Sequence, residues 1–353
     1  MRRLAAAVPV VGLAVLVVTW GRDLPGAVAA VVAVIHAAVV LVAVSHAEDI
    51  AHRVGEPLGT LVLASAVTVI EVALIVTLMA TEGPKAATLA RDTVFAAVMI
   101  VCNGIVGVCL LANARRTHTI RFSEQGANAL LGTVLTLATL SLVVPTFTSS
   151  TPGATLSAGQ LAFSALASVV VYGIFVFVQT GRLRWMFQST DDTGEVDEPH
   201  APSRSLAPAV GLLIVSLVAV VGLAKTLAPS IEDAVVAIGA PQSFVGVVIA
   251  LLVLLPEGVA AVRAARRSQM QTSLNLALGS ALASIGLTIP SIAVASIWLD
   301  GPILLGLGGT EIVLLALTAA VSILTFGSGR ATVLQATHHL AVFAAFIVLA
   351  IEP

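Results

Sequence analysis

The chain has 353 residues, of which 58% are hydrophobic and only 10% are charged, and its formal net charge is −2. Soluble domains carry about 25% charged residues, so this chain has too few polar side chains to cover a water-soluble globule. The absence of a basic block excludes a nucleic-acid-binding protein, and the apolar content excludes a disordered one. The composition therefore predicts an all-α polytopic membrane protein.

Apolar runs that are long enough to cross a bilayer, about 20 residues in a helix, follow one another along the sequence. The first run follows Met1-Arg2-Arg3 as in a signal peptide, but it has no clear small-residue cleavage site, so we expect it to remain as a helix. We expect eleven transmembrane helices, at residues 4–20, 25–45, 58–80, 93–113, 126–145, 159–180, 207–228, 243–262, 272–298, 303–325 and 331–350.

The basic residues are unevenly divided between alternate loops. With a cytoplasmic N-terminus, thirteen of the 17 Lys and Arg residues fall on the cytoplasmic side, and only Arg22, Lys85, Arg91 and Lys225 fall on the outer side. Cytoplasmic loops of membrane proteins are enriched in Lys and Arg. The distribution therefore predicts an N-terminus inside and a C-terminus outside.

The longest polar connection, 181–206, is expected to be a cytoplasmic loop. It contains an acidic run, residues 191–198, which fits either a solvated loop or a weak regulatory cation site. This loop separates six expected helices from five. The odd total suggests one extra N-terminal helix, 1–24, followed by two five-helix units at 25–180 and 207–353.

Two acidic residues, Glu71 and Glu257, lie well inside apolar runs. A charged side chain at the bilayer centre costs about 3 kcal/mol on insertion scales, so such residues are candidates for a functional site. Each glutamate comes about 13 residues after the start of its run, near the membrane midplane at 1.5 Å rise per residue. Because the two runs cross the membrane in opposite directions, the two units form an inverted repeat. Secondary transporters are commonly built in this way.

The helices that follow the two glutamates also correspond, with Asp92 and Asn275 in comparable positions near their starts. Asp92 beside Arg91 fits a capping pair at an outer helix end, or a role in gating or the proton path. Glu311, which we expect about two turns into its helix, is a second candidate for gating or the proton path.

Two facing carboxylates can balance one divalent cation or two monovalent ions or protons. Burial and mutual repulsion favour their protonated forms, so cations and protons would compete for the same oxygens. A cation that leaves water also needs further oxygen ligands, although small hydroxyl residues equally suit helix packing. The candidate supporting side chains are Ser65, Thr68, Asn103, Asn275, Ser280, Ser284 and Thr288.

The segments around Glu71 and Glu257, the small-residue run 278–290 and the stretch Gly327-Ser328-Gly329-Arg330 together resemble the cation/Ca²⁺ exchanger superfamily. The resemblance is strongest to the ChaA-type sodium (potassium)/calcium–proton antiporters of bacteria. It implies a ten-helix core with one added N-terminal helix, in a bacterial inner membrane. It also implies that the two glutamates bind the transported metal cation, with no cofactor, and that export of Ca²⁺, Na⁺ or K⁺ is coupled to proton entry.

Some oxygen-bearing residues of this superfamily are replaced here. Apolar Ala283 stands where calcium-dedicated exchangers have Gln, and Val98-Met99 replace Gly-Ser. These changes weaken the case for Ca²⁺ as the main substrate and leave Na⁺, K⁺ or a mixed preference open. A passive cation channel remains the alternative. An intramembrane enzyme is less favoured, since the spacing of His46 and His52 does not match a metalloprotease motif.

Overall fold

The computed structural model describes residues 2–54, 58–82, 87–114, 119–188, 207–298 and 303–353. The acidic run 191–198 and the side chain of Ser65 lie outside the described parts. Helices account for nearly all of the regular structure, which confirms the predicted all-α class. The elements of the first half are α1 (Arg2–Thr19), α2 (Gly26–Val54), α3 (Leu58–Glu82), α4 (Leu89–Met99), η2 (Ile100–Ile105), α5 (Val106–Ala114), β1 (Ile120–Arg121), α6 (Glu124–Ala138), η3 (Thr139–Val143), α7 (Val144–Phe147), α8 (Ala158–Thr180) and η4 (Arg184–Phe187).

The second half begins after the long connection and has fewer interruptions. Its elements are α9 (Ala207–Ala237), α10 (Phe244–Arg266), α11 (Met270–Ala295), α12 (Gly309–Phe326), β2 (Arg330–Ala331) and α13 (Val333–Ile351). Within the described residues, nine helical segments are long and apolar enough to cross a membrane, and shorter apolar stretches lie in α1 and α3. The chain is thus a multi-pass membrane protein.

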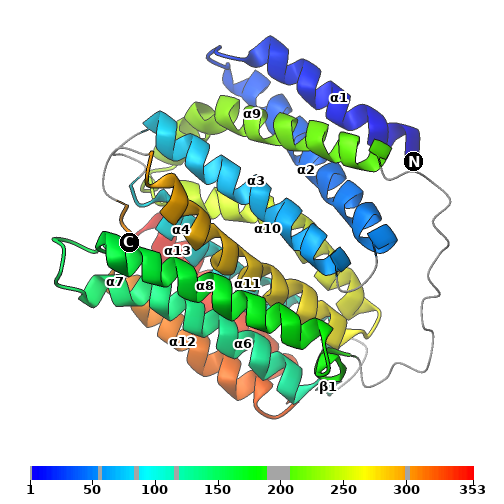
Figure 1. Cartoon of the computed structure of the whole chain (residues 1–353), viewed down its shortest axis with the longest axis vertical. Helices are drawn as coiled ribbons and strands as arrows, with labels where there is room; N and C mark the ends of the chain where they lie inside the picture. Colours follow the sequence, from blue (N-terminus) through cyan, green and yellow to red (C-terminus); the bar gives the residue numbers. More distant parts are fainter. Residues whose placement is uncertain (1, 55–57, 83–86, 115–118, 189–206, 299–302) are drawn as a thin grey trace.

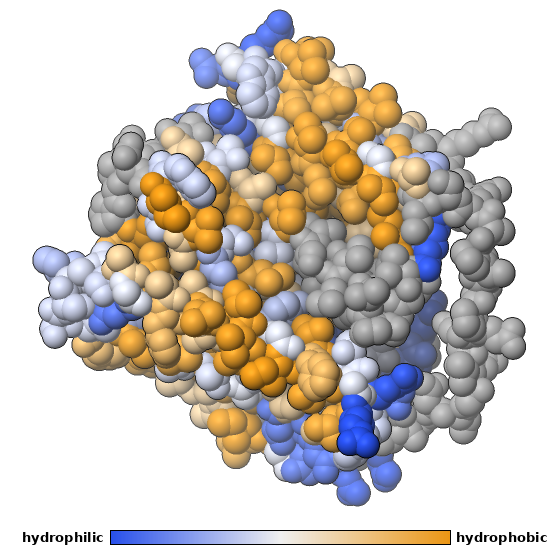
Figure 2. All heavy atoms as spheres, in the orientation of Figure 1, coloured by the Kyte–Doolittle hydropathy of each residue, from blue (hydrophilic) through white to orange (hydrophobic). Residues whose placement is uncertain are grey.

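The helices form a block in which α1 lies at one edge and α6, α8 and α12 lie at the opposite edge (Figure 1). The helices α4, α10, α11 and α13 run between these edges, and the continuous span 89–114 is the most deeply buried of the nine. Apolar side chains cover much of the face shown in Figure 2, while hydrophilic ones gather toward its margins. Large exposed residues such as Val17, Phe177 and Trp298 suit contact with lipid chains rather than water.

Two spans contain a turn of π-helix. In the span 89–114 the π-helical turn is η2, and in the span 124–147 it is η3. A π-helical turn widens the backbone ring and re-aims neighbouring side chains, and such turns occur frequently at functional sites. The turn η2 carries Asn103, one of the candidate ligands.

The connection before α12 differs from the sequence prediction. A helix was expected from residue 303, but α12 begins at Gly309 and residues 303–308 are extended. The backbone N–H groups of this segment donate to other segments, from Leu304 to the Ala87 carbonyl at 3.0 Å and from Leu307 to the Leu142 carbonyl at 2.8 Å. Glu311 therefore lies in the first turn of α12, not two turns inside it.

Short extended pairings tie the two halves together at opposite ends of the bundle. After the span 89–114, β1 pairs antiparallel with β2, with Ile120 opposite Ala331. At the other end of the span 89–114, near its first residue, Leu304 forms an antiparallel bridge with Thr155, and its N–H donates to the Ala87 carbonyl. In the parts of the chain that the structure describes, each end of the bundle thus has extended contacts between the first half and the second.

Candidate cation site

The Glu71 carboxyl group lies at a contact between the two halves of the chain. Helix α3 buries Glu71 so that it is 3% exposed, and Thr68, one turn earlier, is also buried. The hydroxyl of Ser284 on α11 donates a hydrogen bond to Glu71 Oε2. Thr288, one turn further along α11, is also buried, and its Oγ1 has no hydrogen-bond partner of standard geometry within the described residues. The sequence predicts both Glu71 and Ser284 as candidates for the site. In the structure these two side chains are in direct contact, although they are 213 positions apart in the sequence.

The second carboxyl oxygen of Glu71 is able to accept a further hydrogen bond or to bind a cation. Within the described residues, Glu71 Oε1 is buried and has no hydrogen-bond partner of standard geometry. A buried acceptor without a partner costs about 1–3 kcal/mol. The oxygen can recover this free energy by binding a cation or by carrying a proton.

Glu257 is placed differently on α10. Its side chain is half-buried, and both carboxyl oxygens are shielded from solvent. Pro256 precedes it inside the helix and has no N–H to donate to the carbonyl of Leu252, which leaves a backbone oxygen without its usual helical partner. A Cβ at Gly258 would lie 3.2 Å from the Ile105 side chain. The absence of a Cβ there lets α10 approach the π-helical turn η2 at the level of Glu257.

Asn103 is fully buried and joins η2 to α12. Its Nδ2 donates to Thr318 Oγ1 at 2.9 Å, and Thr318 donates in turn to the Leu314 carbonyl at 2.8 Å. In the described residues, Asn103 Oδ1 is buried without a partner, so this amide oxygen is available as a ligand. Thr318 and the π-helical turn were missed by sequence reasoning, since apolar periodicity does not distinguish an α-turn from a π-turn.

Ser280 and Asn275 lie earlier on α11 than Ser284. Ser280 is half-buried one turn before it. Asn275 is nine residues away, about 13 Å along the axis, and its Nδ2 donates to the Phe187 carbonyl at 2.6 Å. This contact attaches the start of α11 to η4, at a distance from the Glu71 carboxyl group.

Asp92 and Glu311 come together at the ends of their helices. Asp92 Oδ1 lies 2.8 Å from Arg91 Nη2, and Thr88 donates to Asp92 Oδ2 at 2.7 Å. Asp92 and Glu311 both line a small cavity of about 50 Å³ beside Ser243. Asp92 lies in the first turn of α4 and Glu311 in the first turn of α12, while Glu71 and Glu257 lie inside their helices.

Two segments of the chain, 24–181 and 208–352, match the model of the sodium/calcium exchanger protein family. The chain belongs to this family. It is 46% identical over 314 residues to the protein y4hA of Sinorhizobium fredii, with 89% of this chain and 86% of that protein covered. It is also 37% identical over 350 residues to the sodium-potassium/proton antiporter ChaA of Escherichia coli, with 96% of this chain and 93% of that protein covered.

Among solved structures, native YfkE has the same fold, with a TM-score of 0.74 at 15% identity, over 99% of this chain and 98% of that one. The exchanger resemblance expected from the sequence is therefore confirmed. The chain is a membrane transporter and not an enzyme.

Proposed function

We propose that this exchanger exports Na⁺ and K⁺, and Ca²⁺ less readily, in exchange for protons that enter from outside. The proposal rests on the Glu71–Ser284 contact between α3 and α11, at which Glu71 Oε1 is buried without a partner among the described residues. The likeness to a sodium-potassium/proton antiporter and the apolar Ala283 and Val98-Met99 support the preference for monovalent ions.

Coupling follows from competition for the same oxygens. A bound cation favours the ionised form of a carboxyl group and so opposes its protonation. A protonated carboxyl group has no net charge with which to bind a cation. An empty, ionised Glu71 is costly in its buried position. Exchange results if the protein changes its accessible side only when the acids are occupied, so no separate proton path is needed.

We propose that the change of access moves two inverted five-helix units, 25–180 and 207–353, relative to one another, with helix 1–24 outside this repeat. The two family matches, 24–181 and 208–352, have nearly these bounds. The paired extended contacts at the two ends of the bundle also fit such an arrangement. The N-terminus is proposed to be cytoplasmic, from the distribution of Lys and Arg.

We assign supporting roles to the candidate polar residues. Thr68, Asn103, Ser280 and Ser284 are proposed as additional ligands, and Asn275 as a more distant support of α11. In the proposed orientation Asp92 and Glu311 face the outer side, where they would gate the entry of protons.

The test uses everted membrane vesicles that contain the full chain and maintain an acidic interior in chloride buffer. Addition of Na⁺ or K⁺ should collapse the pH gradient, with a smaller response to Ca²⁺, as read from an acridine dye. A passive channel would admit the same ions and leave the pH gradient in place. Cation uptake without proton efflux would therefore overturn the proposal.

A further inference from the structure

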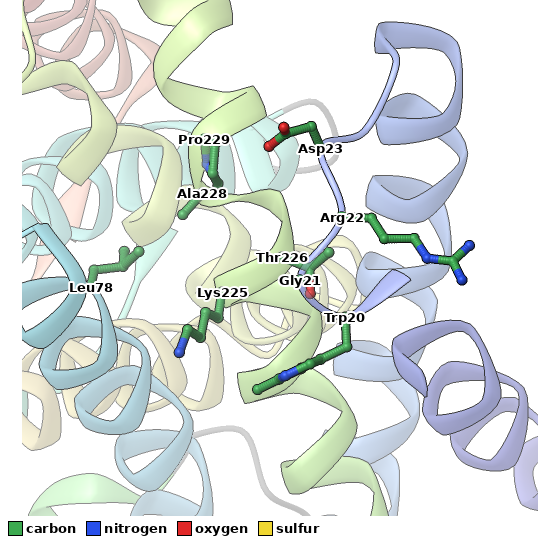
Figure 3. A pocket seen from close by; sticks show the side chains of 9 residues that line it. All are labelled: Trp20, Gly21, Arg22, Asp23, Leu78, Lys225, Thr226, Ala228 and Pro229. Atoms are coloured by element: carbon green, nitrogen blue, oxygen red, sulfur yellow. The ribbon is translucent and has the colours of Figure 1, made fainter. Parts of the chain in front are cut away.

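A second polar cavity lies away from the glutamates, between the α1–α2 turn, α3 and α9 (Figure 3). Its volume is about 320 Å³, which is at the lower end of the range for small-molecule sites, about 300–1,000 Å³. Trp20, Arg22 and Asp23 line it from the turn, Leu78 from α3, and Lys225 from α9. No role in exchange has been given to this cavity.

Lys225 is the unusual residue of this cavity. It lies within the apolar span Ala207–Ala237, where a charged side chain is costly and normally serves a function. Its ammonium group lies 5.3 Å from the centre of the Trp20 ring, within the range of a cation–π contact. Pro229, one turn later, also lines the cavity and has no N–H to donate to the Lys225 carbonyl.

The charges of the lining suit a singly charged anion. Lys225 and Arg22 are cationic and Asp23 is anionic, so these three side chains together carry one positive charge. Figure 3 shows Lys225 beside Trp20, Asp23 reaching toward Pro229, and Arg22 extending outward from the rim. Arg22 is exposed, so its long side chain is able to turn toward a bound anion. A phosphodiester carries one negative charge and matches this lining.

The surface beside the cavity is apolar. Val17 and Val18, which directly precede the turn on α1, are 73% and 60% exposed. Trp20 is half-exposed between them and the charged residues. Aromatic residues with this amphipathic setting are enriched at the level of lipid head groups. A ligand that fits both surfaces has a phosphate at one end and hydrocarbon at the other.

We propose that this cavity binds the head group of a membrane phospholipid, with the phosphate between Lys225 and Arg22 and the acyl chains along Val17 and Val18 of α1. The lipid would join α1, α3 and α9 at this end of the bundle. The binding chemistry does not depend on the proposed exchange activity. With a cytoplasmic N-terminus, Arg22 and Lys225 would bind a lipid of the outer leaflet, and only this choice of leaflet depends on the proposed orientation.

The test measures phosphatidylglycerol binding to the purified, delipidated full chain by native mass spectrometry. The double variant Lys225→Gln/Arg22→Gln is expected to bind this lipid about tenfold more weakly, because each basic residue near a membrane surface contributes appreciably to anionic lipid binding. The control is Arg121→Gln/Arg330→Gln, which removes two exposed basic residues near β1 and β2 and should bind as the wild type does. The single variant Arg22→Gln changes an exposed turn and no helix, so weaker lipid binding by this variant would not come from a disrupted helix.

Two results would overturn the proposal. If the double variant Lys225→Gln/Arg22→Gln and the single variant Arg22→Gln bind the lipid as strongly as the wild type, the cavity does not hold the head group. Displacement of the lipid by inorganic phosphate at matching concentrations would show a site for free anions instead. Neither measurement involves transport, so failure here is distinguishable from failure of the antiport proposal.

Discussion

Glu71 on α3 and Glu257 on α10, which the proposed repeat places at corresponding positions, differ in their surroundings. Glu71 is 3% exposed and accepts a hydrogen bond from Ser284 on α11, a helix whose own proline, Pro290, lies six residues after Ser284. Glu257 is half-buried, follows a proline, and lies at the level where α10 approaches a span with a π-helical turn. The comparison indicates that the first site uses side-chain hydroxyls, while the second has irregular backbone close by. Corresponding positions in a duplicated chain therefore do not imply equal ligands.

The largest expected effect comes from neutralising either acid. Glu71→Gln and Glu257→Gln should each reduce cation-dependent collapse of the pH gradient to the level of vesicles without the protein. An amide carries no negative charge to attract the cation, and it does not take up or release a proton. Neutralising the exposed Glu352 is the matched control and should leave the rate unchanged. Wild-type rates in either of the first two variants would remove that glutamate from the site.

The second prediction concerns the close approach of α10 to α4. A Cβ at Gly246 would lie 2.9 Å from both Asp92 Cβ and the Thr93 backbone nitrogen, and a backbone atom cannot move aside alone. Gly246→Ala should destabilise the protein by about 1–3 kcal/mol, as overpacking typically does, and lower its midpoint of thermal unfolding in detergent.

The control for this packing variant is Gly279→Ala on α11, where a Cβ would meet no atom within 4 Å. This second variant should unfold at or slightly above the wild-type temperature, since Ala is the better helix former. If both variants lose the same stability, the loss comes from replacing any helical glycine and not from a clash at Gly246. The α10–α4 approach would then carry no special constraint.

Much of this architecture was predictable from the sequence, because bilayer-length apolar runs are a strong signal and turn residues separate them. The boundary at 303 was wrong, since the apolar segment 303–308 satisfies its backbone groups through partners such as Ala87 and Leu142. Apolar composition does not show where a helix ends when tertiary partners replace helical bonds. The two glutamates stood out because acids inside spans are rare, but the partners of Asn103 depend on a π-helical turn that no periodicity reveals.

The third prediction distinguishes the two sites through Ser284. Ser284→Ala removes the hydroxyl that donates to Glu71, and hydrogen bonds to charged groups are worth about 1.5–3 kcal/mol. The concentration of Na⁺ or K⁺ for half-maximal collapse of the pH gradient should therefore rise about tenfold or more.

A matched control lies on the same helix. Among the described residues, Ser291 donates to the Leu287 carbonyl one turn back, at 2.7 Å, and not to an acid, so Ser291→Ala should leave the half-maximal concentration unchanged. If the two serine variants have the same half-maximal concentration, the Glu71–Ser284 contact serves packing only. The Glu71 site would then not differ from the Glu257 site by its use of a side-chain hydroxyl.

The smallest effect is expected at Arg91, beside the N-terminal end of α10. Arg91 donates to the Gly306 carbonyl at 3.2 Å and pairs with Asp92, with side-chain exposures of 19% and 11% for the pair. Arg91→Gln should lower stability by about 1 kcal/mol or less, as expected for a partly exposed ion pair, and should leave the half-maximal cation concentration unchanged.

This last variant tests whether the Arg91–Asp92 pair only holds the segment 303–308 in place or also controls proton entry. Thermal unfolding reports the first role, and the pH dependence of exchange reports the second. A small stability loss with an unaltered pH profile would make Arg91 structural and leave the exchange chemistry to α3 and α10. A shifted pH profile with the same stability would instead show that the Asp92–Glu311 pair lies on the proton route, because Arg91 is the cation that balances Asp92.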